Sequence, residues 1–339
     1  MIRVLHLIDD TTPGGVTRYL EFIRHHPAMT GVARHQIRLV TRNRLRAERV
    51  TADIVVSHLA ISWRGLPQFM ALRAANPKVP LIHVEHSYCE GFVAARVSKR
   101  DRFYTLLRCS YSLFDRVVAV SEGQAGWFNR HRLVAADALA VIPPCVDLSA
   151  FRALDAPTGP VDVIGAFGRL DQQKGFDLLI RAYRQVKGQA VLRIHGEGPE
   201  RAALEALAEG DRRIQFTGFV ADPAAAMAQC DAVVMPSRWE PYGIVALEAL
   251  TARRPLLTSP VDGLNDHRTA GAQCIRGASV EVWADALRDL VNGRTGALNV
   301  SPFRTPEQTT AALWQKLLED IAIQPRTSGT ETPRQSSAS

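Results

Sequence analysis

Two carboxylates and the expected start of a helix share one segment, PSRWEPYGIVALEA, at residues 236–249. Glu240 lies on the loop after an apolar strand, and Glu248 lies on the helix that follows. Gly243 and Ile244 stand where that helix begins, and the free N–H groups at the positive end of a helix favour a phosphate. A phosphate site flanked by carboxylates that can accept hydrogen bonds from sugar hydroxyls fits a nucleotide-sugar. A loop carboxylate and a polar helix position would explain the same two residues equally well.

A second segment, AFGRLDQQKGF at residues 166–176, carries two cations after a strand. Arg169 offers a fork of donors and Lys174 a point charge. At the carboxyl edge of a sheet, the two can neutralise a diphosphate and stabilise it as a leaving group. Gly175 and Asp177 also mark the start of the next helix, so a simple strand–turn–helix connection is the alternative.

Short apolar runs alternate with helix-like segments along the chain, which predicts parallel sheets covered on both faces. The first half has its expected strands at residues 3–8, 36–40, 54–57, 81–84 and 117–120, and the second half at 161–167, 190–195, 214–216, 232–235 and 255–258. Between the halves, residues 148–160 are rich in Pro, Gly, Ala and Thr and indicate a linker. We therefore expect an α/β protein with two Rossmann-like, doubly wound domains that face each other across a cleft.

The expected division of the 339 residues has four parts. Residues 1–153 would form the N-terminal acceptor-side domain, and residues 160–305 the C-terminal nucleotide-sugar-binding domain. Residues 306–323 would form a C-terminal helix. Residues 324–339 have no apolar periodicity, and we expect this tail to be disordered.

The composition excludes several classes of protein. A hydrophobic fraction of 46% and a charged fraction of 22% are those of a globular protein. No run approaches the roughly 18 apolar residues of a membrane-spanning helix, and the N-terminus fits a buried strand better than a signal peptide. The five cysteines are widely spaced with no Cys-x-x-Cys pair, which favours reduced thiols over zinc or disulfides. We expect a cytoplasmic protein.

An ordered series of short motifs resembles the family 4 (group 1) nucleotide-sugar glycosyltransferases. The motifs run through nearly all of residues 1–300: PGG at 13–15, HVEH at 83–86, AVSE at 119–122, VIP at 141–143, GRLDQQKG at 168–175, GEGP at 196–199, FTGFV at 216–220 and the glutamate block at 236–249. Each motif alone is weak, but their order is specific. The resemblance implies the two-domain GT-B fold.

The resemblance also implies roles for individual residues. Arg169 and Lys174 would hold the donor diphosphate, and Glu248 would bind the ribose. Glu240 would contact the transferred sugar. Further residues implied at this site are Gly243 and Ile244 through their amides, Gly15 in the close-approach loop of the acceptor domain, and His86 beside the sugar. Members of the family retain the anomeric configuration and need no metal, and the spacing of His83 and His86 does not fit zinc.

We therefore expect a retaining, metal-independent hexosyltransferase that transfers a sugar from a nucleoside-diphosphate sugar. UDP-sugar is the expected donor, with GDP- or ADP-sugar as alternatives, and no other cofactor is expected. The acceptor would be a saccharide or a polyprenyl-diphosphate-linked sugar in cell-surface polysaccharide synthesis. Two rivals stay open, a nucleotide-sugar epimerase on the same fold and a non-catalytic nucleotide-sugar-binding relative. A nucleic-acid partner is not expected, because no recognition motif for one is present.

One departure from the family pattern concerns the segment DGLND at residues 262–266. The family usually has two glycines followed by a glutamate there, so the closure of this loop over the nucleotide does not follow from the resemblance. Smaller departures are Pro144-Cys145 after the Ile-Pro pair and Tyr242 in place of the more usual Phe.

The net charge of +7 arises entirely from residues 1–155. One basic cluster comprises Arg34, Arg38, Arg42, Arg44, Arg46 and Arg49, and a second comprises Arg96, Lys99, Arg100, Arg102 and Arg108. If residues 93–113 are helical, they form a basic amphipathic surface suited to anionic lipid. Peripheral contact of this domain with the inner face of the cell membrane is our hypothesis, and a core-facing helix with a solvated outer face is the equally weighted alternative.

Overall fold

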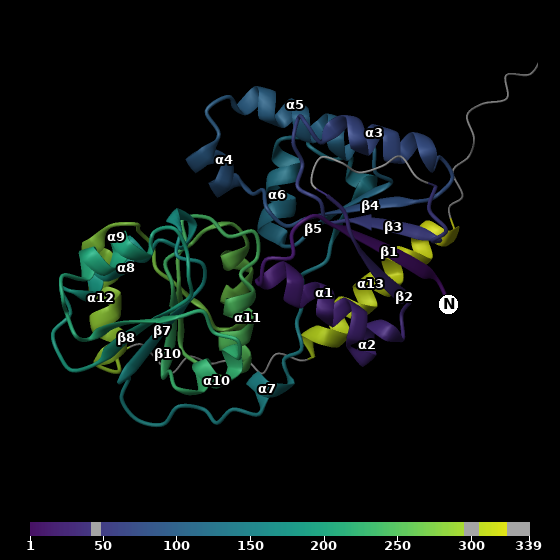
Figure 1. Cartoon of the computed structure of the whole chain (residues 1–339). Helices are drawn as coiled ribbons and strands as arrows, with labels where there is room; N and C mark the ends of the chain where they lie inside the picture. The colour runs from purple at the N-terminus through teal and green to yellow at the C-terminus, as the bar shows by residue number, and fades with distance from the viewer. Residues whose placement is uncertain (42–48, 295–304, 324–339) are drawn as a thin grey trace, which may run out of the picture.

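The computed structural model describes residues 1–41, 49–294 and 305–323, and they form two α/β domains (Figure 1). The N-terminal sheet has the order β2-β1-β3-β4-β5-β6, and every pair is parallel. Its strands are β1 (Arg3–Ile8), β2 (Arg34–Leu39), β3 (Ile54–Ser57), β4 (Leu81–Glu85), β5 (Arg116–Ala119) and β6 (Leu139–Val141). Its helices are α1 (Gly15–His25), α2 (Pro27–Thr30), α3 (Leu66–Ala75), α4 (Glu90–Arg96), α5 (Arg100–Tyr111) and α6 (Glu122–Arg130), with the 3-10 turn η1 (Ala136–Ala138).

The C-terminal sheet has the order β12-β11-β10-β7-β8-β9, also parallel throughout. Its strands are β7 (Val163–Phe167), β8 (Val191–His195), β9 (Ile214–Gly218), β10 (Ala232–Met235), β11 (Leu256–Thr258) and β12 (Gln273–Cys274). Its helices are α8 (Phe176–Tyr183), α9 (Arg201–Ala208), α10 (Pro223–Ala228), α11 (Ile244–Thr251) and α12 (Val280–Val291), with 3-10 segments η2 (Gln172–Lys174) and η3 (Asp262–Ala270). Two doubly wound domains of the GT-B type confirm the expected fold class.

The differences from the expected elements have local causes. The linker contains a short helix, α7 (Ser149–Arg152), because the side chain of Phe151 is buried there. The helix expected after the Glu240 loop begins at Ile244, directly after Gly243, which has a left-handed φ of 90°. Strands β6 and β12 were not expected, since they have only three and two residues. Segments this short show no recognisable pattern of apolar residues.

The basic segment 93–113 is not the single amphipathic helix that our membrane hypothesis assumed. Helix α4 ends at Arg96, the backbone of Val97 is extended, and α5 begins at Arg100. Leu106 and Leu107 are buried in the core of the domain. On this surface the leucines face inward and the charged side chains form the outer face.

Helix α13 (Pro306–Ile323) follows the C-terminal domain in sequence but packs on the N-terminal domain (Figure 1). Trp314 Nε1 donates a hydrogen bond to the Tyr19 hydroxyl of α1 at 2.8 Å, and Thr310 Oγ1 donates to the Pro143 carbonyl at 3.0 Å. Both Trp314 and Tyr19 are almost fully buried. The last described helix therefore completes the core beneath α1.

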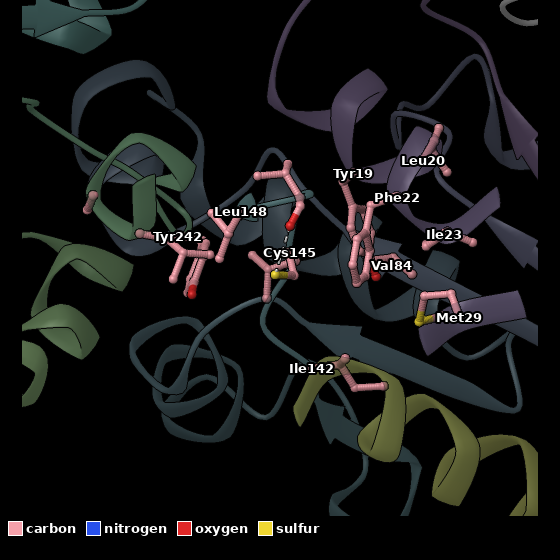
Figure 2. Packing of buried hydrophobic residues seen from close by; sticks show 14 of the residues in the cluster. Tyr19, Leu20, Phe22, Ile23, Met29, Val84, Ile142, Cys145, Leu148 and Tyr242 are labelled. Atoms are coloured by element: carbon pink, nitrogen blue, oxygen red, sulfur yellow. Dashed lines mark hydrogen bonds between the residues drawn. The ribbon is translucent and has the colours of Figure 1, made fainter. Parts of the chain in front are cut away.

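One hydrophobic cluster extends through both domains and the segment between them (Figure 2). Tyr19 of α1, Cys145 and Leu148 after β6, and Tyr242 before α11 are all buried in it. The Tyr242 position that departs from the family pattern thus contributes to packing between the domains. A continuous apolar contact of this kind holds α1 and α11 at the interface.

Three other expectations lie outside the described residues. They concern Arg42, Arg44 and Arg46 of the first basic cluster, the end of the C-terminal domain at residues 295–304, and the tail at 324–339. Among the described residues, no helix is both long and apolar enough to span a bilayer.

Candidate active site

The sheet order places two loops of the C-terminal domain together. Strands β7 and β10 are adjacent at the centre of that sheet, and the connections run in opposite directions from them. Such a switch point leaves a crevice at the carboxyl ends of the strands, where ligands of open α/β sheets bind. The loop after β7 carries Lys174 and the loop after β10 carries Glu240. Their side chains form an ion pair of 2.6 Å (Nζ to Oε2) and are only 16% and 10% exposed.

Arg238 ties these two loops to each other. Its backbone N–H donates to the Gln173 carbonyl at 2.7 Å, and its guanidinium forms two 2.8 Å hydrogen bonds with the carboxylate of Asp177. Gly175 has a φ of 67°, and a Cβ there would collide with the Pro236 carbonyl. Arg238 was missed by the sequence analysis, which read Asp177 only as a helix start, because neither residue reveals its partner without the fold.

Arg169 is placed differently from Lys174. Its side chain is 68% exposed, and its Nε lies 3.8 Å from the carboxylate of Asp171. The GEGP motif packs against this loop, since a Cβ on Gly196 would collide with the Gly168 carbonyl and one on Gly198 with the Leu170 carbonyl. The expected pair of cations is therefore one enclosed ammonium and one solvent-exposed guanidinium.

Two helix N-termini, one from each domain, meet where the domains contact each other. Helix α1 begins at Gly15 and α11 at Ile244, and a Cβ on Gly15 would lie 3.2 Å from Cδ1 of Ile244. Both helices direct free backbone N–H groups and a positive dipole end toward this contact. The expected residues Gly15, Gly243 and Ile244 are thus brought together around one electropositive point.

Glu248 lies one turn further along α11 and faces the other domain. It is 1% exposed, and its Oε1 contacts the Arg18 guanidinium of α1. Burial raises the pKa of the Glu248 carboxyl, and the positive charge of Arg18 only partly offsets that effect. Arg18 is a second residue that the sequence analysis missed, although its place on α1 three residues after Gly15 puts it one turn from the expected site.

The unusual segment 262–266 joins the domains. The Asp262 carboxylate accepts a hydrogen bond from the Gly91 N–H at the start of α4, at 3.1 Å. The Asp266 carboxylate accepts from the N–H groups of Glu122 and Gly123 at the start of α6, at 2.6 and 3.2 Å. Burial raises the pKa of both aspartates, and these N–H groups partly offset it. The departure from the family pattern thus supplies carboxylates that cap two helices of the opposite domain.

His86 follows β4 in the N-terminal domain and is half-buried. Its Nε2 lies 2.8 Å from Nδ1 of His58, and its ring lies edge-on to Tyr19. Burial lowers the pKa of His86 to about 4, although the charge of Glu85 acts in the opposite direction. The structure thus links His86 to other rings of its own domain, and these contacts do not join it to Glu240.

In the described part of the chain, one group of residues could offer three ligands to a metal ion, namely His26, Asp147 and Glu307. Arg152 donates to both carboxylate oxygens of Glu307 at 2.8 and 2.9 Å. The group therefore already holds a cation, and it lies at the linker, apart from Lys174 and Glu240.

Comparison with known proteins agrees with this geometry. Residues 5–150 match the family model described as Glycosyltransferase Family 4, and residues 161–293 match the model described as Glycosyl transferases group 1. The two matches fall on the two domains. The chain belongs to the family 4 (group 1) glycosyltransferases.

Individual relatives resemble the chain at moderate identity. The alpha-D-kanosaminyltransferase of Streptomyces kanamyceticus is 32% identical over 49% of this chain and 39% of the relative. The D-inositol 3-phosphate glycosyltransferase of Nocardia farcinica is 30% identical over 71% of this chain and 59% of the relative. The chain thus spans about half the length of these curated relatives. The crystal structure of Anabaena Alr3699/HepE in complex with UDP-glucose, at 18% identity, covers 96% of this chain and 100% of its own with a TM-score of 0.70.

Proposed function

We propose that this chain is a retaining, metal-independent glycosyltransferase that uses a nucleoside-diphosphate sugar. The observation that carries the proposal is the enclosed Lys174–Glu240 pair at the switch point, beside the N-terminus of α11. In the reaction, the bond between the anomeric carbon and the diphosphate breaks and the acceptor hydroxyl oxygen bonds to that carbon, while the hydroxyl proton passes to the departing diphosphate. The departing diphosphate gains negative charge, which fixed donors and cations stabilise.

The residues divide this task by their chemistry. An ammonium has three N–H donors, so Lys174 can hold Glu240 and still donate to a phosphate oxygen. The N–H groups at the starts of α1 and α11 face the same point and supply the positive charge that a metal would otherwise provide. Glu248 has its Oε1 against Arg18, which leaves its other oxygen to accept a hydrogen bond from a ribose hydroxyl. Arg169, being exposed, is the second cation for the outer phosphate.

UDP-glucose or another UDP-sugar is the proposed donor. The support is the similarity of fold to the Anabaena protein whose structure contains UDP-glucose. We propose a saccharide or polyprenyl-diphosphate-linked sugar as the acceptor, in the synthesis of a cell-surface polysaccharide.

We propose that the enzyme works on the cytoplasmic side of the cell membrane, through electrostatic contact alone. Lys99, which precedes α5, and Arg100 and Arg102 on its outer face are exposed, whereas the leucines of that helix are buried. Because the helix has no free apolar face, the contact would be of cations with anionic headgroups rather than insertion.

A thermal-shift screen tests the donor proposal. A ligand that binds only the folded state at about 100 times its Kd adds about 2.7 kcal/mol of stability. We expect UDP and UDP-glucose to raise the Tm of the wild type and to raise that of Lys174→Ala much less. Lys187→Ala is the matched control, because this exposed lysine precedes β8 at the opposite edge of the sheet. A Tm that no nucleoside diphosphate or its sugar changes would refute the proposal.

Product analysis tests the reaction itself. Incubation with UDP-glucose and a saccharide acceptor should release UDP and yield an α-linked product, without added metal and in the presence of a chelator. A β-linked product would refute retention, and activity that a chelator abolishes would refute independence of metal. Free epimerised UDP-sugar as the only product would show that the chain is an epimerase.

A further inference from the structure

Four histidines of the N-terminal domain form one hydrogen-bonded row that the proposed donor site does not use. The contacts are His35 Nδ1 to His6 Nε2 at 3.0 Å, His6 Nδ1 to His58 Nε2 at 2.9 Å, and His58 Nδ1 to His86 Nε2 at 2.8 Å. Successive ring centroids are 5.2, 5.2 and 5.1 Å apart. Direct contacts of this length are hydrogen bonds from one ring nitrogen to the next.

The register of the parallel sheet produces this row. His35 of β2 pairs with Val4 of β1, and His6 lies two residues further along β1. His58 follows β3 and aligns with the end of β1, and His86 follows β4 at a position two residues further again. Strands β2, β1, β3 and β4 are neighbours in the sheet. Because side chains alternate with a period of two, all four rings lie on one face of the sheet. From His35 to His86, each ring lies two residues nearer than the last to the edge where the strands end.

Helices α1 and α13 enclose the row. The Tyr19 ring lies edge-on to His58 and His86, and the Trp314 ring lies edge-on to His6. Burial lowers the pKa of His6 and His58 well below its ordinary value, and lowers that of His35 to about 4. With the pKa of His86 also at about 4, all four rings are neutral at pH 7.

When all four rings are neutral, the three hydrogen bonds of the row must all run in the same direction from donor to acceptor. A neutral imidazole has one N–H donor and one acceptor nitrogen, and each of the three contacts needs one N–H. Four rings supply four N–H groups, so the remaining one lies at an end of the row, on Nε2 of His35 or on Nδ1 of His86. If the fourth N–H lies at one end, every bond in the row points toward that end. The tautomer of His86 is therefore coupled to that of His35.

We propose that His35, His6 and His58 are positioning residues for His86. His58 holds Nε2 of His86, so that Nδ1 is the ring nitrogen left to contact a sugar hydroxyl in the cleft. Whether Nδ1 donates or accepts is then set by the whole row, including residues that never touch a substrate. The identity of the hydroxyl rests on the proposed function, whereas the coupling of the rings does not.

Four variants test the row. His6→Phe interrupts it, and His6→Gln keeps one donor and one acceptor at the same place. His35→Phe removes the outer end of the row, on the edge strand β2. His83→Gln is the matched control, because His83 lies on β4 but on the opposite face, against Glu85.

Nitrogen NMR of protein labelled with ¹⁵N in the histidine rings, at pH 7.5, reads the tautomers directly. We expect His6→Gln and His83→Gln to keep the tautomer population that His86 has in the wild type, and His6→Phe and His35→Phe to change it. Ring signals of His86 that are the same in the wild type and in both Phe variants would overturn the proposal. This measurement needs no substrate, so its result is distinct from failure of the proposed function.

Kinetics with UDP-glucose supply the second measurement. By analogy with residues that orient metal ligands, we expect His6→Phe to lower kcat about tenfold or more. The KM for UDP-glucose should stay within about twofold, because His6 contacts none of the proposed nucleotide-binding side chains Lys174, Glu248 and Arg18. His6→Gln should restore kcat. A rise in KM with unchanged kcat would overturn a role in positioning His86.

Discussion

The two domains contribute to the cleft in different ways. The C-terminal domain supplies charged side chains on two loops that follow adjacent strands, and these loops are held by ion pairs such as Lys174–Glu240 and Arg238–Asp177. The N-terminal domain supplies a row of neutral rings, two on strands β2 and β1 and two directly after β3 and β4, held by hydrogen bonds between their nitrogens. The C-terminal domain thus carries most of the side chains suited to an anion, whereas the N-terminal domain adds a row of uncharged rings to the start of α1 and Arg18.

This difference fits the two partners of a sugar transfer. A diphosphate is recognised by charge and by helix N-termini, which tolerate small displacements. Sugar hydroxyls are recognised by donors and acceptors whose direction must be fixed. Each domain would then carry the type of contact that its ligand needs, and the following predictions test that division.

The largest effect on activity is expected from the charged side chains of the C-terminal domain. Lys174→Ala removes an enclosed cation from the proposed phosphate site and leaves Glu240 buried without its partner. We expect kcat/KM for UDP-glucose to fall about 10²–10³-fold, the usual result of removing one donor that stabilises developing charge. Arg169→Ala should have a smaller effect because that side chain is exposed to solvent. Equal losses in the two variants would show that enclosure of the cation is irrelevant.

The next effect is a difference in stability between the domains at low pH. A histidine whose pKa falls from 6.5 in the unfolded chain to about 4 in the folded protein stabilises the fold above pH 6.5. This contribution is lost as the pH falls toward 4, at up to about 1.4 kcal/mol per pH unit for each group. The N-terminal domain has four histidines with a lowered pKa: His35 and His86 at about 4, and His6 and His58 well below the ordinary value. The C-terminal domain has two, His195 and His267, both at about 4.

Buried carboxylates increase the expected difference in acid stability between the two domains. Burial raises the pKa of Glu248, Asp262 and Asp266, and a raised carboxylate pKa favours the folded state as the pH falls. These groups belong to the C-terminal domain and oppose the effect of its histidines. Hydrogen exchange at pH 7 and pH 5 should therefore show a greater loss of protection in the N-terminal sheet. Equal losses in the two sheets would contradict the lowered pKa values of the histidine row.

A smaller effect is expected at the contact between the domains. A Cβ on Gly123 of α6 would lie 2.5 Å from the Asp262 carbonyl, which belongs to the backbone of the opposite domain. Overpacking of this kind costs about 1–3 kcal/mol. Gly123→Ala should therefore separate the domains, with a larger radius of gyration in small-angle scattering and weaker binding of UDP-glucose.

Gly126→Ala is the control on the same helix. A Cβ there meets only the end of the flexible Arg130 side chain, at 3.3 Å. We expect this variant to keep the radius of gyration and the affinity of the wild type. A Gly123→Ala protein as compact as Gly126→Ala would show that the Asp262 contact does not hold the domains together.

What could be predicted from the sequence follows the same division. Lys174, Glu240 and Gly243 lie on short contiguous segments after strands. The position of such a segment relative to its strand and helix can be predicted from the sequence alone. Arg18, Arg238 and the row from His35 to His86 depend on strand order and register, which a single sequence does not reveal. Arg169 and Lys174 share one loop, but only the fold distinguishes the enclosed cation from the exposed one.

The smallest effect is expected at the outer face of α5. Anionic membranes attract each nearby Lys or Arg by about 1 kcal/mol, which is about fivefold in affinity. Arg102 stacks on the exposed ring of Trp63, so Lys99 and Arg100 are the better residues to change. The variants Lys99→Ala and Arg100→Ala should each weaken sedimentation with vesicles of phosphatidylcholine and phosphatidylglycerol by about that factor.

Salt and a control residue separate electrostatic contact from insertion. Exposed charges are screened within about 3 Å at 1 M salt, so binding through cations alone should disappear there. Insertion of apolar side chains would persist, but Leu106 and Leu107 are buried and cannot insert without local unfolding. Lys187→Ala, in the less basic C-terminal domain, should bind as the wild type does. Binding that resists 1 M salt, or that Lys187→Ala weakens as much as Lys99→Ala does, would refute a membrane contact specific to the N-terminal half of the cleft.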